Sequence, residues 1–186
     1  MTNNIVSEVE LSYKNRVPYS QRQKVTDSSS VYEVLRNIFP TETIDYRETF
    51  IVLYLNKAHQ ILGYSVVAEG GISQVAVDVK MIMQGALLAN ASVIILAHNH
   101  PSGNLNPSLE DRKLTEQVAE ASKLFEIRVL DHLIVTSESF YSLSDRCRVG
   151  ISDFKPAQQL TVGWRKPAYP FGYSNRIATR ECTLYP

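Results

Sequence analysis

Two histidines, His98 and His100, stand two positions apart directly after the apolar run Ser92 to Ala97 (SVIILA). Such a run is typical of a buried strand, in which alternate side chains point to the same side of the sheet. Two imidazoles on one side of a strand end can bind the same metal ion. A His-x-His pair is common by chance, so the residues that follow decide its interpretation.

The segment after the histidines supplies a third candidate ligand. Pro101 to Pro107 contains proline, glycine and asparagine and predicts a loop, and a helix is expected from Ser108 to about Phe125. Asp111 would then lie in the first turn of that helix, close to the strand end. Ser108 and Asp111 also match a helix capping box, which is a purely structural pattern. Capping and metal binding can coexist in these two residues.

Two imidazoles and one carboxylate form a donor set that zinc accepts, and they leave a fourth position for water. That arrangement is typical of catalytic zinc, whereas structural zinc normally has four protein ligands, mostly cysteine. The two cysteines of the chain, Cys147 and Cys182, match no zinc-knuckle or Cys-x-x-Cys spacing. The sequence therefore predicts a mononuclear zinc site of the hydrolase type, with His98, His100 and Asp111 as ligands.

The whole segment resembles the JAMM motif of the MPN-domain metalloenzymes, which consists of His-x-His, seven residues, Ser, two residues and Asp. The form HNHPSG, followed by PS and D, is similar to that of the bacterial RadC-like proteins within this family. The resemblance covers roughly Thr26 to Ser144 and includes Arg47-Glu48-Thr-Phe before the first predicted core strand.

The resemblance implies a role for each motif residue. His98, His100 and Asp111 would bind zinc. Glu48 would accept a proton from the metal-activated water and return it to the leaving amine, and Ser108 would donate a hydrogen bond to the oxyanion. This chemistry is consistent with general principles, because zinc lowers the pKa of a bound water to about 7 and a nearby carboxylate can then move protons.

Other acidic and histidine side chains compete for these roles. Glu42 and Glu69 also lie upstream of the histidines, and the family's Arg-Glu-x-Phe context is what selects Glu48. Asp131 and His132 are adjacent in a predicted strand, so they are expected to face opposite sides of it. We expect them to support the core or the ligands and not to bind the metal themselves.

The remaining apolar patterns predict the elements that must position these residues. The predicted elements are a helix through Val31, Val34, Leu35 and Ile38 with a Ser30–Glu33 capping box, a hairpin of Phe50 to Leu55 and Ile61 to Val67, a helix burying Val75, Val79, Ile82, Met83, Ala86 and Leu87, and strands at Ile127 to Val135 and Phe140 to Leu143. Their order predicts an α/β fold with a mixed sheet sandwiched between helices. The resemblance implies the JAB/MPN architecture, which is cytidine-deaminase-like.

Three regions follow from this organisation. Residues 1–26 form a polar N-terminal segment with a weak edge-strand pattern from Ile5 to Leu11, and residues 27–150 form the RadC-like metalloenzyme domain. Residues 151–186 hold five basic and two acidic side chains, although the whole chain has no net charge. They lack apolar periodicity, so we expect a poorly ordered basic aromatic tail.

The predicted function is a zinc-dependent hydrolase of the metallopeptidase or isopeptidase type, with a peptide or protein as substrate. The alternative is a DNA-repair-associated accessory protein with a structural or vestigial metal site. Basic residues interleaved with aromatic ones in the tail could give weak nucleic-acid contact by stacking on single-stranded bases. The sequence does not predict an oligomeric state.

Several function classes lack their motifs in this sequence. The Pro-Cys-x-x-Cys of zinc deaminases, the Gly-x-Ser-x-Gly of serine hydrolases and the phosphate-binding loop of nucleotide hydrolases are all absent. The N-terminus carries no secretory pattern, and the most apolar stretch, Met81 to Ala97, is interrupted by polar residues. These features predict a cytoplasmic protein without membrane contact.

Overall fold

A five-stranded mixed sheet lies at the centre of the computed structural model, which describes residues 10, 12–14, 16–70 and 76–146. The strands are β1 (Thr49–Leu55), β2 (Ile61–Glu69), β3 (Val93–Asn99), β4 (Arg128–Val135) and β5 (Phe140–Ser142). Their order in the sheet is β2-β1-β3-β4-β5. The β3–β4 pair is parallel and the other three pairs are antiparallel. The predicted hairpin and mixed sheet are confirmed.

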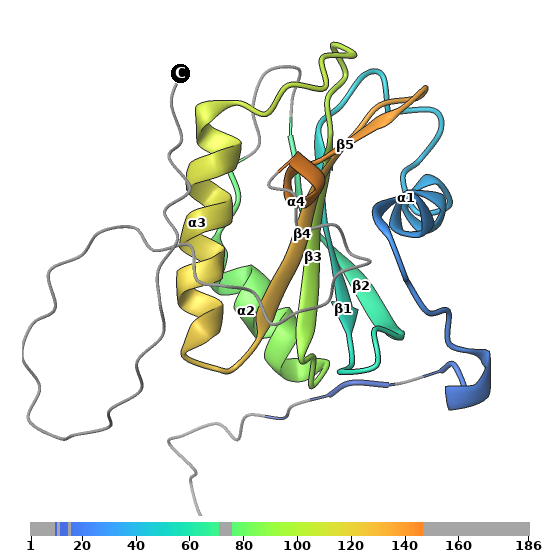
Figure 1. Ribbon diagram of the computed structural model, residues 1–186, viewed down its shortest axis with the longest axis vertical. Coiled ribbons are helices and arrows are strands. Elements are labelled where there is room, and N and C mark those ends of the chain that lie inside the picture. Colours follow the sequence, from blue (N-terminus) through green and yellow to red (C-terminus); the bar gives the residue numbers. More distant parts are fainter. Residues whose placement is uncertain (1–9, 11, 15, 71–75, 147–186) are drawn as a thin grey trace, which may run out of the picture. The chain divides into compact units, whose positions relative to one another are not determined.

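Helices cover both faces of this sheet (Figure 1). Helix α1 (Ser28–Arg36) lies on one side, and α2 (Val79–Leu88) and α3 (Leu109–Lys123) pack against each other on the opposite side. The short α4 (Leu143–Arg146) follows β5, and a 3-10 turn, η1 (Tyr19–Gln21), precedes α1. The predicted α/β sandwich is therefore confirmed.

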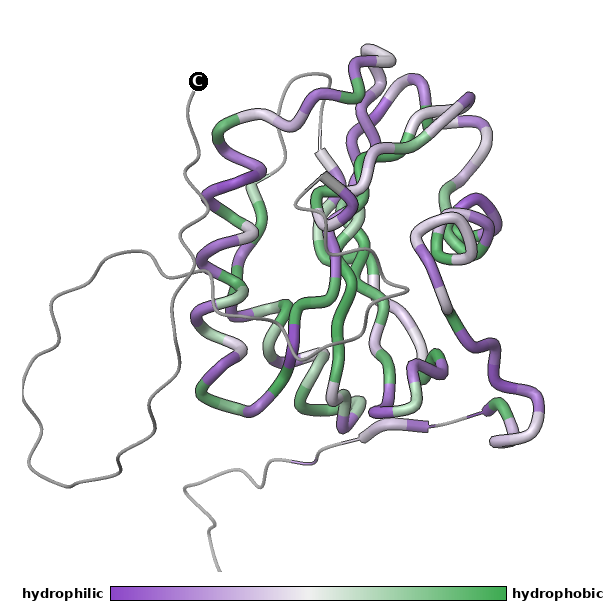
Figure 2. Tube along the Cα trace, viewed as in Figure 1, coloured by the Kyte–Doolittle hydropathy of each residue, from purple (hydrophilic) through white to green (hydrophobic). Residues whose placement is uncertain are grey.

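The two central strands supply most of the core. Every residue of β1 and of β3 is buried, as expected for strands that are covered by helices on both faces. One core cluster lies between the sheet and helices α2 and α3 and includes Phe50, Val52, Ile94, Leu96 and Val118. Figure 2 shows these strands as a hydrophobic centre, with hydrophilic stretches along α1 and α3.

Helix α2 differs in part from the predicted apolar stripe. Ile82, Met83 and Ala86 are buried as predicted, but Leu87 is 49% exposed. The prediction for Leu87 was wrong because three consecutive apolar residues span too wide an arc for all of them to face the sheet. The helix begins at Val79, where Asp78 accepts a hydrogen bond from the backbone of the second helical residue. Val75 lies outside the described residues.

The cap of α1 also differs from the prediction. Asp27, and not Ser30, precedes the helix, and its Oδ1 accepts the backbone N–H of Ser30 at 2.7 Å. The Ser30 hydroxyl returns a hydrogen bond to the Asp27 carbonyl at 2.7 Å. The carboxylate of Asp27 is the stronger acceptor, so the capping box lies three residues earlier than the Ser30–Glu33 pattern suggested.

Helix α3 connects the parallel strands β3 and β4 and begins where the sequence predicted. Ser108 is its N-cap, and Ser108 and Asp111 form a reciprocal capping box. The helix therefore brings its first turn back to the carboxyl end of β3, the end at which ligand sites of α/β sheets usually lie. At its other end the helix stops at Lys123, slightly before the predicted end at about Phe125, and Phe125 is 49% exposed.

Two of the predicted regions fall mainly outside the part of the chain that the structure describes. Most of the edge-strand pattern from Ile5 to Leu11 and all of the tail 151–186 lie outside the described residues.

Within the described part, no helix has the length and apolar character that crossing a membrane requires.

Gly85 is expected to tolerate no side chain, because a Cβ there would collide with the Tyr54 hydroxyl oxygen and lie 2.7 Å from Tyr54 Cζ. Tyr54 is buried and its hydroxyl is 2.6 Å from Ser65 Oγ, so the ring cannot move freely. Gly85→Ala should therefore lower the free energy of unfolding by about 1–2 kcal/mol, despite the better helix propensity of alanine.

The matched control is Gly63→Ala, because nothing lies within 4 Å of a Cβ at Gly63 in β2. Its free energy of unfolding should change by less than about 1 kcal/mol. Denaturant unfolding of both variants measures the difference. Equal stabilities of the two variants would contradict the close packing of Tyr54 against α2.

Candidate metal centre

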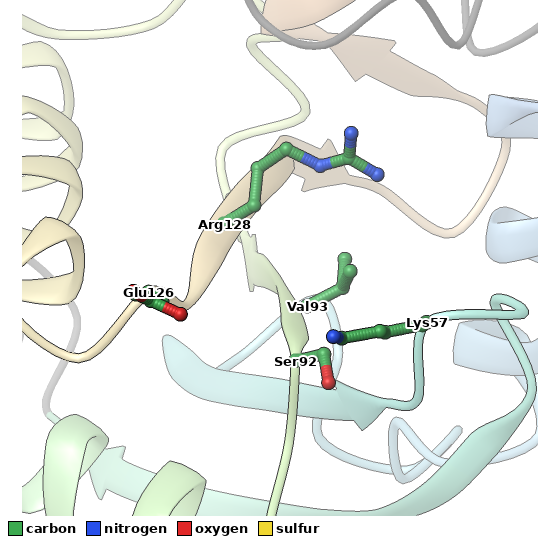
Figure 3. A pocket seen from close by; sticks show the side chains of 5 residues that line it. All are labelled: Lys57, Ser92, Val93, Glu126 and Arg128. Carbon is green, nitrogen blue, oxygen red and sulfur yellow. The ribbon is translucent and has the colours of Figure 1, made fainter.

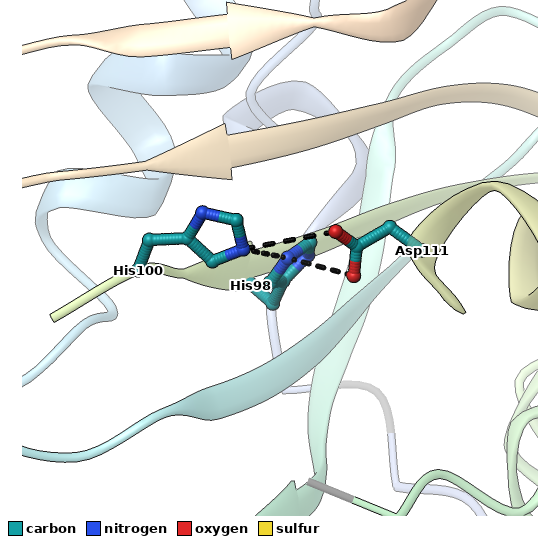
Figure 4. Close-up of side chains that lie close together, drawn as sticks. All are labelled: His98, His100 and Asp111. Atoms are coloured by element: carbon teal, nitrogen blue, oxygen red, sulfur yellow. Dashed lines mark hydrogen bonds and ion pairs between the residues drawn. The ribbon is translucent and has the colours of Figure 1, made fainter. Parts of the chain in front are cut away.

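His98, His100 and Asp111 converge at the carboxyl end of β3 (Figure 4). His98 Nε2 lies 2.9 Å from His100 Nε2 and 3.2 Å from Asp111 Oδ1, and His100 Nε2 lies 3.7 Å from Asp111 Oδ2. Of the residues that the structure describes, these three form the group of His, Cys, Asp or Glu side chains that could hold a metal ion. The structure thus brings together the three predicted ligands.

Backbone contacts on β3 fix the two histidines. His98 pairs with Phe50 of β1 and Ile134 of β4 in the middle of the sheet and is fully buried. His100 is partly exposed, and its backbone N–H donates to the Val135 carbonyl at 3.0 Å. The group is therefore buried on one side and open to solvent at His100.

The hydrogen bond of the His100 ring assigns its tautomer. His100 Nδ1 lies 2.5 Å from the Asn104 carbonyl oxygen, which can only accept. Nδ1 therefore carries the hydrogen, and in the neutral ring the lone pair of Nε2 faces His98 and Asp111. Asn104 was not recognised from the sequence, because a loop carbonyl contact has no residue-type pattern.

A chain of hydrogen bonds assigns the tautomer of His98 in the same way. Thr115 Oγ1 donates to the Asp111 carbonyl at 2.6 Å, so at its 2.6 Å contact with His132 Nδ1 it must accept. Burial holds the pKa of His132 well below its usual value, so the ring is neutral and has a single N–H. His132 Nε2 therefore accepts from His98 Nδ1 at 2.8 Å, and in the neutral form of the His98 ring the Nε2 lone pair faces the group.

His132 thus supports a candidate ligand, as predicted, and its neighbour Asp131 faces the other way. The Asp131 carboxylate is buried and accepts hydrogen bonds from the Ser142 hydroxyl at 2.6 Å and the Ser144 backbone at 3.0 Å. Thr115, which completes the chain to His132, was missed from the sequence. Its spacing of four residues from Asp111 places it on the same side of α3, and that spacing was the available signal.

Ser108 and Asp111 combine capping with a place in the candidate centre. Asp111 Oδ2 accepts from the Ser108 backbone N–H and hydroxyl, both at 2.7 Å, and the Asp111 N–H donates to Ser108 Oγ at 3.1 Å. Burial alone would raise the pKa of the Asp111 carboxyl. Hydrogen bonds from His100, His98 and Ser108 outweigh burial and hold this pKa far below its usual range. The carboxylate is therefore anionic and oriented.

The same contacts act on His100. The hydrogen bond with Asp111 raises the pKa of His100, burial opposes it, and the Asn104 carbonyl acts in the raising direction. Asp111 and Glu48 are the two carboxylates whose charge adds to this shift. The centre is accordingly a place that favours positive charge.

Glu48 lies half-buried beside this group, immediately before β1. Burial raises the pKa of its carboxyl, whereas the nearby His98 and His100 lower it and Asp111 raises it again. Glu48 is thus near enough to interact with all three candidate ligands, although it does not belong to the ligand group. Glu42 and Glu69, the two competing carboxylates, are exposed.

A shallow pocket of about 260 Å³ lies elsewhere, at the amino end of β3. Its lining, drawn in Figure 3, consists of Lys57, Ser92, Val93, Glu126 and Arg128. Val93 and His98 lie near opposite ends of the same strand, so this pocket is separate from the candidate metal centre.

Comparison with known proteins gives the family. The family described as RadC-like JAB domain matches residues 25–148. A UPF0758 protein of Flavobacterium johnsoniae is 33% identical over 142 residues, which are 76% of this chain and 61% of that protein. A UPF0758 protein of Porphyromonas gingivalis is 38% identical over 145 residues, which are 76% of this chain and 62% of that protein. UPF0758 protein YfjY of Escherichia coli is 41% identical over 99 residues, which are 53% of this chain and 62% of that protein.

The chain spans about three fifths of the length of these three relatives. The family match covers two thirds of the chain and includes every residue of the candidate centre from Glu48 to His132. Together with the mixed sheet between helices, it confirms the resemblance that the motif indicated. The chain belongs to the RadC-like proteins of the JAB/MPN family.

Proposed function

We propose that this chain is a zinc-dependent hydrolase of the metallopeptidase or isopeptidase type. The observation that carries the proposal is the direction of the donor atoms. The Nδ1 atoms of His98 and His100 are bonded elsewhere, their Nε2 atoms face the anionic Asp111 carboxylate, and Glu48 stands beside them without joining the group. Lone pairs and a negative charge that converge in this way favour a cation between them.

The spacing of the donors fits zinc. Ligands at 2.0–2.2 Å from a tetrahedral zinc ion lie about 3.4 Å from one another. The three separations of 2.9, 3.2 and 3.7 Å bracket that value. Calcium and magnesium prefer oxygen ligands alone, whereas two imidazoles with one carboxylate suit zinc.

His98, His100 and Asp111 would hold the ion, which when bound supplies the Lewis acidity that lowers the pKa of a water molecule to about 7. Glu48 accepts the proton of that water at its carboxylate and delivers it to the nitrogen of the departing amine. The raised pKa of Glu48 suits this exchange, because a base works best when its pKa is near the working pH.

Ser108 is proposed to stabilise the oxyanion. Its hydroxyl has one hydrogen, which it donates to Asp111 Oδ2 in the structure. If Asp111 held a cation, its carboxylate would be a weaker acceptor, and the Ser108 hydroxyl would be able to turn toward a new negative oxygen. The substrate is proposed to be a peptide or protein, because amide hydrolysis requires both the proton acceptor and the proton donor that Glu48 supplies in turn.

The experiment that tests the function begins with metal analysis of the purified full chain. We expect about one zinc ion per chain, as a mononuclear site requires. The zinc-loaded protein is then screened by mass spectrometry against peptide and isopeptide-linked substrates, with chelator-treated protein as the control. Cleavage should disappear on chelation and return when zinc is added.

Full zinc occupancy with no hydrolysis of any tested amide would favour the alternative, an accessory protein whose metal is structural. A single-stranded oligonucleotide binding assay on the same preparation then tests the nucleic-acid contact proposed for residues 151–186. Absence of bound zinc would exclude the zinc hydrolase and the structural zinc site, and would leave a vestigial site as the remaining reading of the centre.

Thr115→Val is expected to weaken zinc binding about 10-fold while leaving all three ligands in place. The variant keeps the shape of the side chain but removes the hydroxyl that accepts from His132 Nδ1, so the His98 tautomer is no longer enforced. Loss of such an outer contact typically lowers metal affinity by about 10- to 100-fold. Competition with a chromophoric chelator measures the affinity.

The matched control is Thr115→Ser, which retains the hydroxyl and should retain near-native affinity. If Thr115→Val binds zinc as tightly as Thr115→Ser, the chain through His132 does not hold the ligand.

A further inference from the structure

Asn99, the residue between the two histidines, holds the backbone on both sides of Glu48. Its side chain is fully buried, at 0% exposure. Its Oδ1 accepts the Thr49 backbone N–H at 2.8 Å, and its Nδ2 donates to the Arg47 carbonyl at 2.6 Å. Because alternate residues of a strand face opposite sides, Asn99 makes these contacts on the face of β3 away from the histidine rings.

The remaining hydrogen of the amide is also used. Nδ2 donates to the Ile44 carbonyl at 2.6 Å, so one acceptor and two donors all meet backbone partners. These partners assign the orientation of the amide. The Thr49 N–H must face the amide oxygen, and the Ile44 and Arg47 carbonyls must face the NH₂ group. On the other side of this segment, the Gly70 N–H donates to the Glu48 carbonyl at 2.9 Å. The backbone of Glu48 is therefore held by its own carbonyl and by both adjoining peptide groups.

Aspartate, serine and alanine do not reproduce these three bonds. An aspartate would place a negative charge against two carbonyl oxygens, and a serine or alanine is too short to reach them. A buried asparagine could serve only to satisfy an irregular turn before β1. However, the hydrogen bonds of Asn99 lie on both sides of Glu48 in the sequence. Glu48 is the residue of this segment whose charge acts on the three candidate ligands. The contacts therefore concern the position of a specific carboxylate.

We propose that Asn99 is a positioning residue that fixes the Glu48 carboxylate at its working distance from the candidate ligands His98, His100 and Asp111. Strand β3 and the residue that follows it would thus carry two candidate ligands, His98 and His100, and between them the support of the proposed base. The inference rests on the proposed function, in which Glu48 moves protons.

The test is Asn99→Ala in the full chain. Zinc content should stay at about one ion per chain, because the three ligands are unchanged. With the substrate found in the screen, kcat should fall about 10²-fold and KM should stay unchanged, as expected when a catalytic group is displaced by about 1 Å. In a Glu48→Gln background, Asn99→Ala should cause no further loss of kcat, since both changes act on one group.

Hydrogen exchange supplies a readout that needs no substrate. The Thr49 amide should exchange faster in Asn99→Ala, whereas the β3 amides should be unaffected. Asn37→Ala is the matched control, because Asn37 also donates its side-chain amide to a backbone carbonyl but lies exposed at the end of α1. It should leave zinc content, kcat and Thr49 exchange unchanged.

The outcomes separate this inference from the proposed function. If Glu48→Gln keeps full turnover, the proposed role of Glu48 has failed, and with it the reason for positioning it. If Glu48→Gln loses turnover but Asn99→Ala keeps it, the inference on Asn99 is wrong while the function stands. If Asn99→Ala and the milder Asn99→Ser both lose zinc, Asn99 maintains the fold or the ligands, and the inference is overturned.

Discussion

His98→Ala is expected to abolish stoichiometric zinc binding and, with it, all metal-dependent hydrolysis. His98 is fully buried at the centre of the ligand group, and its two ring nitrogens contact His132 on one side and the other two ligands on the other. No water molecule can replace an imidazole nitrogen there with comparable affinity for zinc. Metal analysis after gel filtration measures the loss, and enzyme assay follows turnover.

Asp111→Ala should lose zinc as well, but it also removes half of the α3 capping box. Asp111→Asn separates the two effects, because an asparagine can still accept from Ser108 while the negative charge is gone. The control is Glu110→Ala, an exposed carboxylate in the same helical turn. Metal content that stays unchanged in both His98→Ala and Asp111→Ala would disprove the zinc site.

Glu48→Gln is expected to keep its zinc and to lose turnover by a factor of about 10² or more, the usual effect of removing a positioned acid–base group. Glutamine preserves the shape of the side chain and removes its ability to take up a proton. Because Glu48 does not belong to the ligand group, metal content should equal that of the unmodified chain. Steady-state kinetics together with metal analysis on the same preparation give both values.

Glu42→Gln and Glu69→Gln are the controls for this assignment. Both residues are exposed carboxylates upstream of the histidines, and both variants should retain full turnover. If one of them loses activity while Glu48→Gln does not, the base has been assigned to the wrong carboxylate. The zinc site itself could still be correct in that case.

Much of the fold could be predicted from the sequence because burial leaves a periodic pattern. The apolar runs of β1 and β3 and the helical spacing in α3 each require a particular element, and those elements are present. Predictions failed at element ends. There, one residue decides the outcome, as when Asp27 replaced Ser30 as the cap of α1. The four-residue α4 is too short to show any period.

The convergence of the three candidate ligands could be predicted because these residues are close in sequence and have distinctive chemistry. The residues that orient the ligands could not all be predicted, since they act through contacts between distant parts of the chain. Thr115 and Asn104 reach the histidines through a hydroxyl and a backbone carbonyl, groups that occur throughout any protein. Asn99 was visible between the histidines, but its partners lie about fifty residues earlier.

The candidate ligands and the proposed base are brought together by contacts of very different range along the chain. His98 and Asp111 are thirteen positions apart, whereas β1, which carries Glu48 at its start, pairs with β3 across forty-eight positions from Phe50 to His98. Closing the longer loop costs about 1 kcal/mol more in chain entropy, since this cost grows with the logarithm of loop length. Opening of the β1–β3 pairing would separate the proposed base from the candidate ligands and leave these ligands together. Under mild denaturation, turnover should therefore be lost before the metal is released.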